Sequence, residues 1–447
     1  MDLSVGIDVG TTKVAVVVSR CHDGKIMFSK SINHEAGYPN ENGLSEQDVS
    51  KFFDALICLF SSIPIDIKAH IRSLGVSGQM HGVMLWNSEN DYTKLINWQD
   101  QRASRKNILS SIQQKPGCSG LKDGFGFTTL AILKDEVDLS SFKYSGTIQD
   151  FFVWSFLRNK ENSFMDPTNA ASWGLFNIST LQWDFDAIES LGIPLSIVPK
   201  IKRSGSIISS ICQEWSNRME IKRGIPVFLA MGDNQASVFG SATSIDEEIF
   251  INIGTSAQLS FISEVLLQNE GKHYEIRPFF DEKYLIVSAP LCGGEAWKLL
   301  VTSARQWITT FIPTIDISDE EIYRIIDQKG AESIDKDDLP LVSPHFLGER
   351  WDETLKGSIH GITLHNFDLG RISAAFAIGI AKNLISDIET QHMINKSRII
   401  AAGNAIRKST TLQKAVTKVF HKEVVINDDK EEAAFGASRV AYLFLKK

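Results

Sequence analysis

Residues 3–19 read LSVGIDVGTTKVAVVVS, and this stretch is the first informative feature of the sequence. Two runs rich in β-branched residues flank a turn at Gly10, Thr11 and Thr12, a pattern typical of a β-hairpin. A Walker A loop would need the pattern G-K-[ST] followed by a helix, and that motif does not occur in the chain. The stretch therefore predicts two strands joined by a tight turn that contains glycine.

A second copy of the pattern occurs at residues 249–259, which read IFINIGTSAQL. Gly254 aligns with Gly10 and Thr255 with Thr11, whereas Asn252 takes the place of Asp8. Because each copy opens about half of the chain, we interpret the pair as an internal duplication. We expect two related domains, residues 1–243 and 244–447, on either side of a cleft.

The segments that follow each copy alternate between strand and helix patterns, as in α/β domains. Residues 45–61 predict an amphipathic helix and residues 74–77 a strand. Near the end of the chain, residues 398–402 and 424–426 predict strands, and an alanine-rich helix begins at Glu431. Both halves are therefore predicted to have an α/β fold.

Composition limits the possible partners. The formal net charge of −8 argues against a nucleic-acid footprint, which needs basic patches. The 5 cysteines lie far apart without a C-x-x-C pair, as expected of reduced thiols in a cytoplasmic protein. Neither a signal-peptide pattern nor an apolar run of about 20 residues occurs, so we expect no membrane partner.

The two turns have the chemistry of phosphate-binding loops. Glycine lets the backbone approach a phosphate closely, and exposed amides and threonine hydroxyls donate hydrogen bonds to its oxygens. Lys13 would add positive charge, and Asp8 offers the oxygen ligands that Mg²⁺ prefers. The competing interpretation is an ordinary tight turn whose hydroxyls satisfy local amides.

A candidate catalytic carboxylate follows the apolar run at residues 227–231, which predicts a buried strand. Asp233 then lies where a helix is expected to begin. Phosphoryl transfer to a hydroxyl needs a group that accepts the proton, and the helix dipole would keep this carboxylate ionised. The alternative is that Asp233 only caps the helix.

Residues 78–82 (GQMHG) and 97–102 (NWQDQR) contain side chains suited to a sugar. Amide, imidazole and carboxylate groups can recognise hydroxyls, while an indole packs against the C–H face of a sugar ring. The candidates are Gln79, Met80, His81, Trp98 and Asp100. His81 is alternatively a structural histidine, and Trp98 a core residue.

Taken in order, these motifs resemble the FGGY carbohydrate kinases, which belong to the actin–hexokinase–heat-shock ATPase superfamily. The resemblance extends over nearly the whole chain. It is carried by residues 6–12, 46–48, 77–82, 232–236 and 254–256, together with Gly403 and the final alanine-rich helix.

The resemblance implies two ribonuclease-H-like domains that bind ATP and a small sugar, with Asp233 as catalytic base and with Asp8 and Asp233 at an Mg²⁺ site. The implied nucleotide ligands are Gly10, Thr11, Thr12, Lys13, Gly254, Thr255, Gly294, Gly403 and Asn404. The implied sugar ligands are Gln79, Met80, His81, Trp98, Asp100, Asp233 and Asn234. The implied assembly is a monomer or a homodimer.

Within the family, residues 98–102, 169–174, 235–238 and 347–350 favour a member that phosphorylates sedoheptulose to sedoheptulose 7-phosphate. The alternatives are a kinase for another ketose or a polyol, such as xylulose or ribulose, and a non-catalytic sensor of sugar or nucleotide. Two positions depart from the family pattern. Ala402 replaces a glycine before Gly403, and Gln101 replaces a glycine between Asp100 and Arg102.

Overall fold

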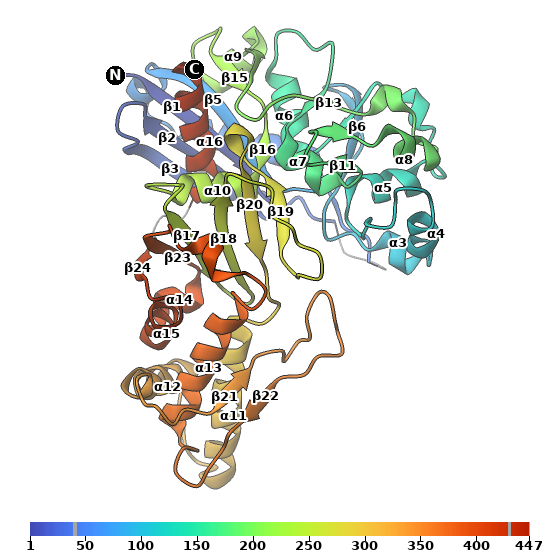
Figure 1. Ribbon diagram of the computed structural model, residues 1–447. Helices are drawn as coiled ribbons and strands as arrows, with labels where there is room; N and C mark the ends of the chain where they lie inside the picture. Colours follow the sequence, from blue (N-terminus) through green and yellow to red (C-terminus); the bar gives the residue numbers. More distant parts are fainter. Residues whose placement is uncertain (39–42, 428–430, 447) are drawn as a thin grey trace. The chain divides into compact units, whose positions relative to one another are not determined.

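The computed structural model describes residues 1–38, 43–427 and 431–446, in two compact units. Unit 1 comprises Met1–Ser241, the short segment Arg277–Glu282 and the C-terminal segment that carries the last helix. Unit 2 comprises Ala242–Ile276 and Lys283–Asp428. In Figure 1 most of unit 1 is coloured from blue to the light green of α10 (Asp233–Ser241), and the dark red helix α16 (Glu432–Leu443) also belongs to it.

Unit 1 is built on a sheet with the strand order β14-β15-β5-β1-β2-β3, with β16 also pairing with β5. Strands β1, β2 and β3 are antiparallel neighbours, whereas β5 and β15 continue the sheet parallel to β1. The strands are β1 (Leu3–Val9), β2 (Lys13–Arg20), β3 (Ile26–Asn33), β5 (Ile71–Gly78), β14 (Ile207–Ser210), β15 (Pro226–Phe228) and β16 (Met231–Gly232).

Unit 2 repeats this arrangement. Its sheet has the order β19-β20-β18-β17-β23-β24, with β20, β18 and β17 antiparallel and β17, β23 and β24 parallel. The strands are β17 (Glu248–Ile253), β18 (Ala257–Ser263), β19 (Glu275–Pro278, of which Arg277 and Pro278 belong to unit 1), β20 (Tyr284–Ser288), β23 (Arg398–Ala402) and β24 (Glu423–Ile426). Both predicted hairpins are therefore confirmed. Each begins the same five-strand core of three antiparallel strands continued by two parallel ones, as expected of a duplicated domain.

The predicted helix at residues 45–61 begins later than expected. The structure has α1 at Val49–Ser61, and the Asp48 side chain caps it by accepting a hydrogen bond of 3.0 Å from the Ser50 amide. Residues Glu46–Gln47 instead form strand β4, which pairs with β8 (Leu95–Ile96). The amphipathic pattern gave the helix correctly, but the capping aspartate marks its start.

A lobe inserted between β5 and β15 has its own core around the aromatic side chains of Phe127, Trp173 and Trp183. Its elements are β6 (Met84–Ser88), β7 (Asp91–Tyr92), β8, α3 (Arg102–Arg105), α4 (Leu109–Gln113), α5 (Gly126–Leu133), β9 (Tyr144–Gly146), β10 (Phe164–Met165), α7 (Pro167–Trp173), β11 (Phe176–Asn177), β12 (Gln182–Trp183), α8 (Phe185–Ser190) and β13 (Lys200–Ile201). Helix α6 (Ile148–Phe156), which also lies between β5 and β15 in sequence, packs into the core of the first sheet. Unit 1 also contains α2 (Ile65–Lys68), α9 (Gln213–Met219) and α10 (Asp233–Ser241).

Helices of unit 2 pack around a core formed by Ile249, Ile251 and the apolar faces of its long helices. These helices are α11 (Gly294–Phe311), α12 (Asp319–Ser333), α13 (Leu369–Asn383), α14 (Asn404–Lys408) and α15 (Thr410–Phe420), with strands β21 (Leu341–Ser343) and β22 (Ser358–His360) between them. In Figure 1, α11, α12 and α13 lie together beyond one end of this sheet.

The last helix, α16 (Glu432–Leu443), lies at the end of the sequence but belongs to unit 1. It packs so closely on the first sheet that a Cβ at Gly6 would lie 1.9 Å from the Ala434 carbonyl oxygen. A Cβ at Gly436 would likewise meet the Ala236 carbonyl oxygen of α10 at 1.9 Å. The compact units therefore differ from the predicted ranges 1–243 and 244–447, because small residues let the C-terminal helix return to the first sheet.

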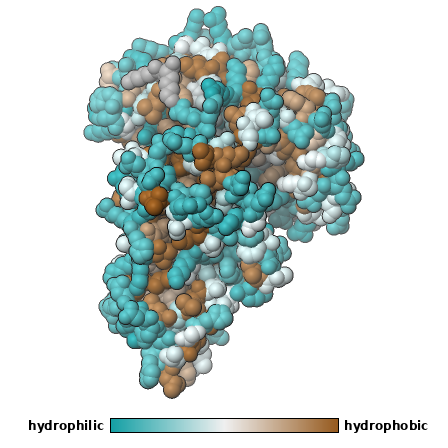
Figure 2. Space-filling model, viewed as in Figure 1, coloured by the Kyte–Doolittle hydropathy of each residue, from teal (hydrophilic) through white to brown (hydrophobic). Residues whose placement is uncertain are grey.

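The face shown in Figure 2 carries hydrophilic side chains with hydrophobic patches between them. Among the described residues, no helix is both long enough and apolar enough to cross a membrane.

Candidate active site

Three parallel strands of unit 1 bring candidate residues to one edge of the sheet. Asp8 of β1 is paired in register with Ser77 of β5, and Gly232 of β16 is paired with Gly78. Gln79 and Asp233 follow directly after these paired residues. Open α/β sheets bind ligands at the carboxyl ends of their parallel strands, so these residues form a candidate site.

The carboxylates of Asp8 and Asp233 are half-buried, and the negative charge of Asp8 acts on Asp233. Burial raises the pKa of Asp8 to about 6, although the Ser77 hydroxyl donates a 2.9 Å hydrogen bond to it. Burial, and then the negative charge of Asp8, raise the pKa of Asp233 to about 7. Raised pKa values in a pair of neighbouring carboxyls are typical of functional sites.

These two carboxylates fit a magnesium ion. Mg²⁺ is usually held by one or two carboxylates together with water and substrate phosphates, and a full set of protein ligands is rare. Within the described residues, no group of three or more His, Cys, Asp or Glu side chains could hold a metal ion. A nearby cation would also stabilise the ionised forms of two neighbouring carboxylates, because its positive charge offsets their repulsion.

The turn of the first hairpin is closed by the Gly10 amide, which donates a 3.0 Å hydrogen bond to the Lys13 carbonyl. Thr12 is exposed, whereas Gly10, Thr11 and Lys13 are partly buried. The Lys13 ammonium group donates to both carboxylate oxygens of Glu431, at 2.8 and 2.7 Å. Glu431 therefore fixes the lysine that was predicted to add charge to the turn.

Gln79 lies deeper than a sugar ligand should. Its side chain is 1% exposed, and its amide contacts Gln47 and Thr11. The sequence predicted that this amide recognises sugar hydroxyls. In the structure it accepts a hydrogen bond from Thr11, in the turn at residues 10–12 that was predicted to bind phosphate. Gln47 was not singled out from the sequence as a site residue, although it lies in a motif that carried the family resemblance.

Met80 lies near the start of α10, and His81 lies at the end of α7, where it contacts Ser172. A Cβ at Gly232 would lie 2.9 Å from the Met80 sulfur, so Met80 packs against the residue that precedes Asp233. His81 has a φ of 71°, a left-handed conformation that is uncommon for this residue. The Ser172 carbonyl accepts a 2.6 Å hydrogen bond from Nδ1 of His81, which makes Nε2 the unprotonated nitrogen of the neutral ring.

Trp98 is not a core residue, because 47% of its surface is exposed. Its indole Nε1–H donates a 2.9 Å hydrogen bond to the Thr11 hydroxyl. The indole is therefore held beside the turn at residues 10–12, and its exposed face could pack against an apolar surface of a ligand.

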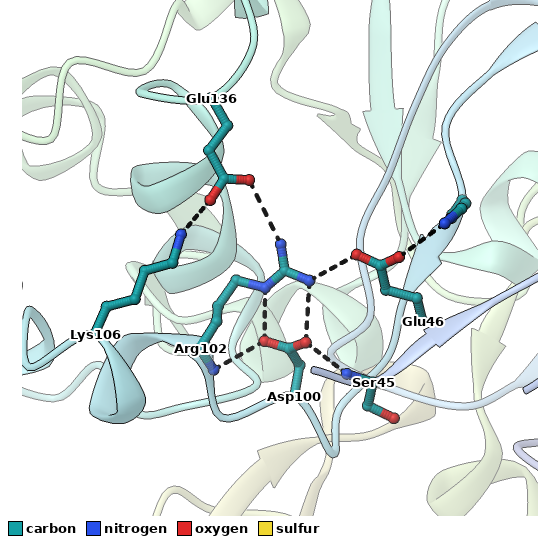
Figure 3. A network of polar contacts seen from close by, with 7 residues as sticks. Ser45, Glu46, Asp100, Arg102, Lys106 and Glu136 are labelled. Atoms are coloured by element: carbon teal, nitrogen blue, oxygen red, sulfur yellow. Dashed lines mark hydrogen bonds and ion pairs between the residues drawn. The ribbon is translucent and has the colours of Figure 1, made fainter. Parts of the chain in front are cut away.

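Asp100 has no free carboxylate oxygen for a sugar, as Figure 3 shows. Oδ1 accepts from the backbone and Nε of Arg102 at 3.0 and 2.7 Å, and Oδ2 accepts from Arg102 Nη2 and the Ser45 amide at 3.1 and 2.8 Å. Arg102 in turn reaches Glu46 and Glu136. Asp100 is 2% exposed and Arg102 4%, so this buried network stabilises the structure of the lobe.

Asp100→Asn is expected to lower the free energy of unfolding by about 3 kcal/mol. The change removes the negative charge that pairs with the buried guanidinium of Arg102. Chemical denaturation would measure the loss. Asp135→Asn is the matched control, since Asp135 forms an exposed ion pair with Lys134 that should contribute less than about 1 kcal/mol. A stable Asp100→Asn protein with a greatly raised KM for sugar would instead make Asp100 a ligand.

Arg277 is a second residue that the sequence did not single out. It belongs to unit 1 and donates a 3.0 Å hydrogen bond from Nη1 to the Asn234 side-chain oxygen. Its positive charge lowers the pKa of Asp233, against the stronger upward effects of burial and Asp8. The segment is held by the Gln235 amide, which donates to the Pro278 carbonyl, and by ring contacts of Phe239 with the two phenylalanines that follow.

Unit 2 brings its predicted nucleotide residues together at the equivalent strand ends. Asn252 of β17 is paired in register with Ala402 of β23. The Gly294 amide donates a 2.8 Å hydrogen bond to the Gly254 carbonyl at the start of α11. Gly403 has a φ of 98°, and a Cβ there would lie 2.4 Å from the Asn252 side-chain oxygen. Thr255 and Asn404 are exposed, so backbone and side-chain donors of this unit remain open to a phosphate.

Residues 3–240 match the N-terminal domain of the FGGY family of carbohydrate kinases, and the chain belongs to this family. It is a phosphotransferase of carbohydrate metabolism, as the resemblance predicted.

The relatives of the chain agree with this assignment. Sedoheptulokinase from Mus musculus is 29% identical over 472 residues, covering 98% of this chain and 97% of the mouse protein. The structure of ligand-bound xylulose kinase from Lactobacillus acidophilus has a TM-score of 0.77 at 22% identity, covering 100% of this chain and 90% of that one. Glycerol kinase from Plasmodium falciparum with ADP has a TM-score of 0.76 at 22% identity, with coverage of 100% and 90%. These two structures share the predicted actin- and hexokinase-like fold.

Proposed function

We propose that this kinase transfers the γ-phosphate of ATP to the terminal primary hydroxyl of sedoheptulose, giving sedoheptulose 7-phosphate and ADP. The observation that carries the proposal is the pair of half-buried carboxylates, Asp8 and Asp233, at the carboxyl ends of β1 and β16. The choice of sedoheptulose is supported by the mouse sedoheptulokinase, whose similarity extends over almost the full length of both proteins.

Asp233 is the proposed general base. The sugar oxygen forms a bond to the γ-phosphorus while the bond from phosphorus to the ADP oxygen breaks, and the hydroxyl proton passes to the Asp233 carboxylate. A carboxyl with a pKa of about 7 is matched to this task near neutral pH. Met80 and His81 lie on the segment beside it and are the proposed sugar contacts, with Asn234.

The remaining predicted sugar ligands divide into two groups. Trp98 offers an exposed apolar face and is proposed as a sugar or nucleotide contact. Gln79 and Asp100 are buried, so we propose that they position other residues and do not touch the sugar.

ATP is the phosphoryl donor implied by the family, and the glycerol kinase structure with ADP supports it. In unit 1, Gly10, Thr11, Thr12 and Lys13 are the proposed phosphate contacts; in unit 2 they are Gly254, Thr255, Gly294, Gly403 and Asn404. Asp8, with Asp233, would hold Mg²⁺, which when bound would neutralise charge on the phosphates.

Arg277→Met is expected to lower kcat about 30-fold, because a hydrogen bond from a charged group contributes about 1.5–3 kcal/mol. The change frees Asn234 and removes the positive charge beside Asp233. Steady-state kinetics would measure kcat and KM, with Arg277→Lys recovering part of the loss. Arg218→Met on the exposed face of α9 is the control. A kcat within about threefold of wild type would remove Arg277 from the site.

ADP release with a panel of ketoses and polyols tests the proposed function. We expect sedoheptulose to give the highest kcat/KM, and Asp233→Ala to abolish sugar-dependent release. A higher kcat/KM with xylulose would identify a xylulose kinase. Xylulose is the specific alternative because the similar structure from Lactobacillus acidophilus is a xylulose kinase. Sugar binding without turnover on any member of the panel would identify a sensor and overturn the proposal.

A further inference from the structure

Three residues of unit 1 form a closed ring of hydrogen bonds beside the candidate site, through three side chains and the Thr11 backbone carbonyl. The Thr11 hydroxyl donates to Oε1 of Gln79 at 3.4 Å, and Nε2 of Gln79 donates to Oε1 of Gln47 at 2.9 Å. Nε2 of Gln47 then donates to the Thr11 carbonyl at 2.8 Å. Gln47 is 3% exposed and Gln79 1%, so water cannot easily replace these bonds.

Gln47 is held firmly in this ring because its strand is fixed from the other side. β4 pairs with β8, and the Glu46 carboxylate contacts Arg102 and Lys94 in the network of Figure 3. Successive side chains of a strand point to opposite faces. Glu46 therefore anchors the strand in the lobe while Gln47 reaches the ring.

Glutamine suits this position because its amide both accepts and donates. Gln79 needs an acceptor for Nε2, and the Thr11 carbonyl needs a donor. A glutamate at position 47 would keep the acceptor but would place a second acceptor against the Thr11 carbonyl. A leucine would supply neither.

The ring joins the two sides of the site. Thr11 lies in the turn proposed to hold phosphate, and its hydroxyl also accepts from Trp98. Gln79 is followed by Met80, which packs beside Gly232, the residue before Asp233. Gln47 contributes two of the three hydrogen bonds that join these segments in the ring.

We infer that Gln47 is a positioning residue that couples nucleotide binding to sugar binding. The inference rests on the proposed function, since it takes the turn as the phosphate site and the segment after Gln79 as the sugar site. Both segments contact the same ring, so a ligand that stabilises the arrangement of the ring from one segment also favours the arrangement that the second ligand binds. The coupling is reciprocal, because it is a property of the complex of both ligands.

Isothermal titration calorimetry with Mg·ADP and sedoheptulose tests the inference, because this pair binds without turnover. In wild type we expect each ligand to raise the affinity for the other about 10-fold. In Gln47→Leu we expect this factor to fall below about 2. Gln182→Leu, at an exposed position of unit 1, is the matched control and should keep the wild-type factor.

Gln47→Glu decides the question if the leucine variant does not fold, since it has nearly the same size and keeps the acceptor. It is expected to lower the coupling factor as well. A wild-type factor in a folded Gln47 variant would overturn the inference, as would the binding of both ligands to wild type without mutual effect. Both of those results would leave the proposed function standing, whereas binding of no sugar from the panel would overturn that function too.

Discussion

Asp233→Asn is expected to lower kcat about 10³-fold, within the range that general-base catalysis contributes. The amide has nearly the shape of the carboxylate but cannot accept the hydroxyl proton. Since the proton is transferred only in the transition state, KM for the sugar should change far less than kcat.

Steady-state assays with the preferred sugar would measure this loss. Asp186→Asn, at an exposed position in the first turn of α8, is the matched control and should leave kcat unchanged. A kcat for Asp233→Asn within about tenfold of wild type would rule out Asp233 as the base.

The same substitution should stabilise the metal-free protein at high pH. Asp233 has a folded-state pKa of about 7, above its ordinary value of 3.8, so its protonated form favours folding. That contribution is complete below about pH 4 and is lost as the pH rises through about 7. Asp233→Asn should therefore exceed wild type in unfolding free energy by about 1–3 kcal/mol at pH 8 with a chelator present, as measured by denaturation.

Asp8→Asn is expected to lower kcat/KM for Mg·ATP about 10²-fold, because a neutral amide is a weaker ligand for a hard cation. Excess Mg²⁺ should restore part of the activity. Removing the charge of Asp8 should also lower the pKa of Asp233, since Asp8 contributes to raising it.

Activity measured over a range of Mg²⁺ concentrations, for wild type and Asp8→Asn, would test this role. Asp23→Asn provides the comparison, because Asp23 is an exposed partner of Arg20 in the same unit. An unchanged Mg²⁺ requirement in Asp8→Asn would place the metal elsewhere.

The hairpins, the strands and the order of the motifs were predictable because their signals are local. The β-branched runs around Gly10 and Gly254 specify strands and turns within a few residues. The topology around each hairpin then follows from alternating strands and helices. The return of α16 to the first sheet was not predictable, because it depends on small residues meeting at Gly6 and Gly436.

The carboxylates were predictable as candidates, whereas their surroundings were not. Arg277 contacts Asn234 across 43 positions of sequence, and Gln47 contacts Thr11 across 36. No local pattern indicates such pairs. Asp100 illustrates the reverse error: its residue type suited a sugar hydroxyl, but its carboxylate is occupied by Arg102 and Ser45.

Phosphorus NMR of the product formed from ATP and sedoheptulose by the wild-type protein tests the proposed reaction most directly. We expect one new phosphomonoester, on the terminal primary carbon, formed in equal amount to ADP and about 10³-fold more slowly with Asp233→Asn. Phosphate released as free inorganic phosphate, or an ester at a secondary hydroxyl, would contradict it.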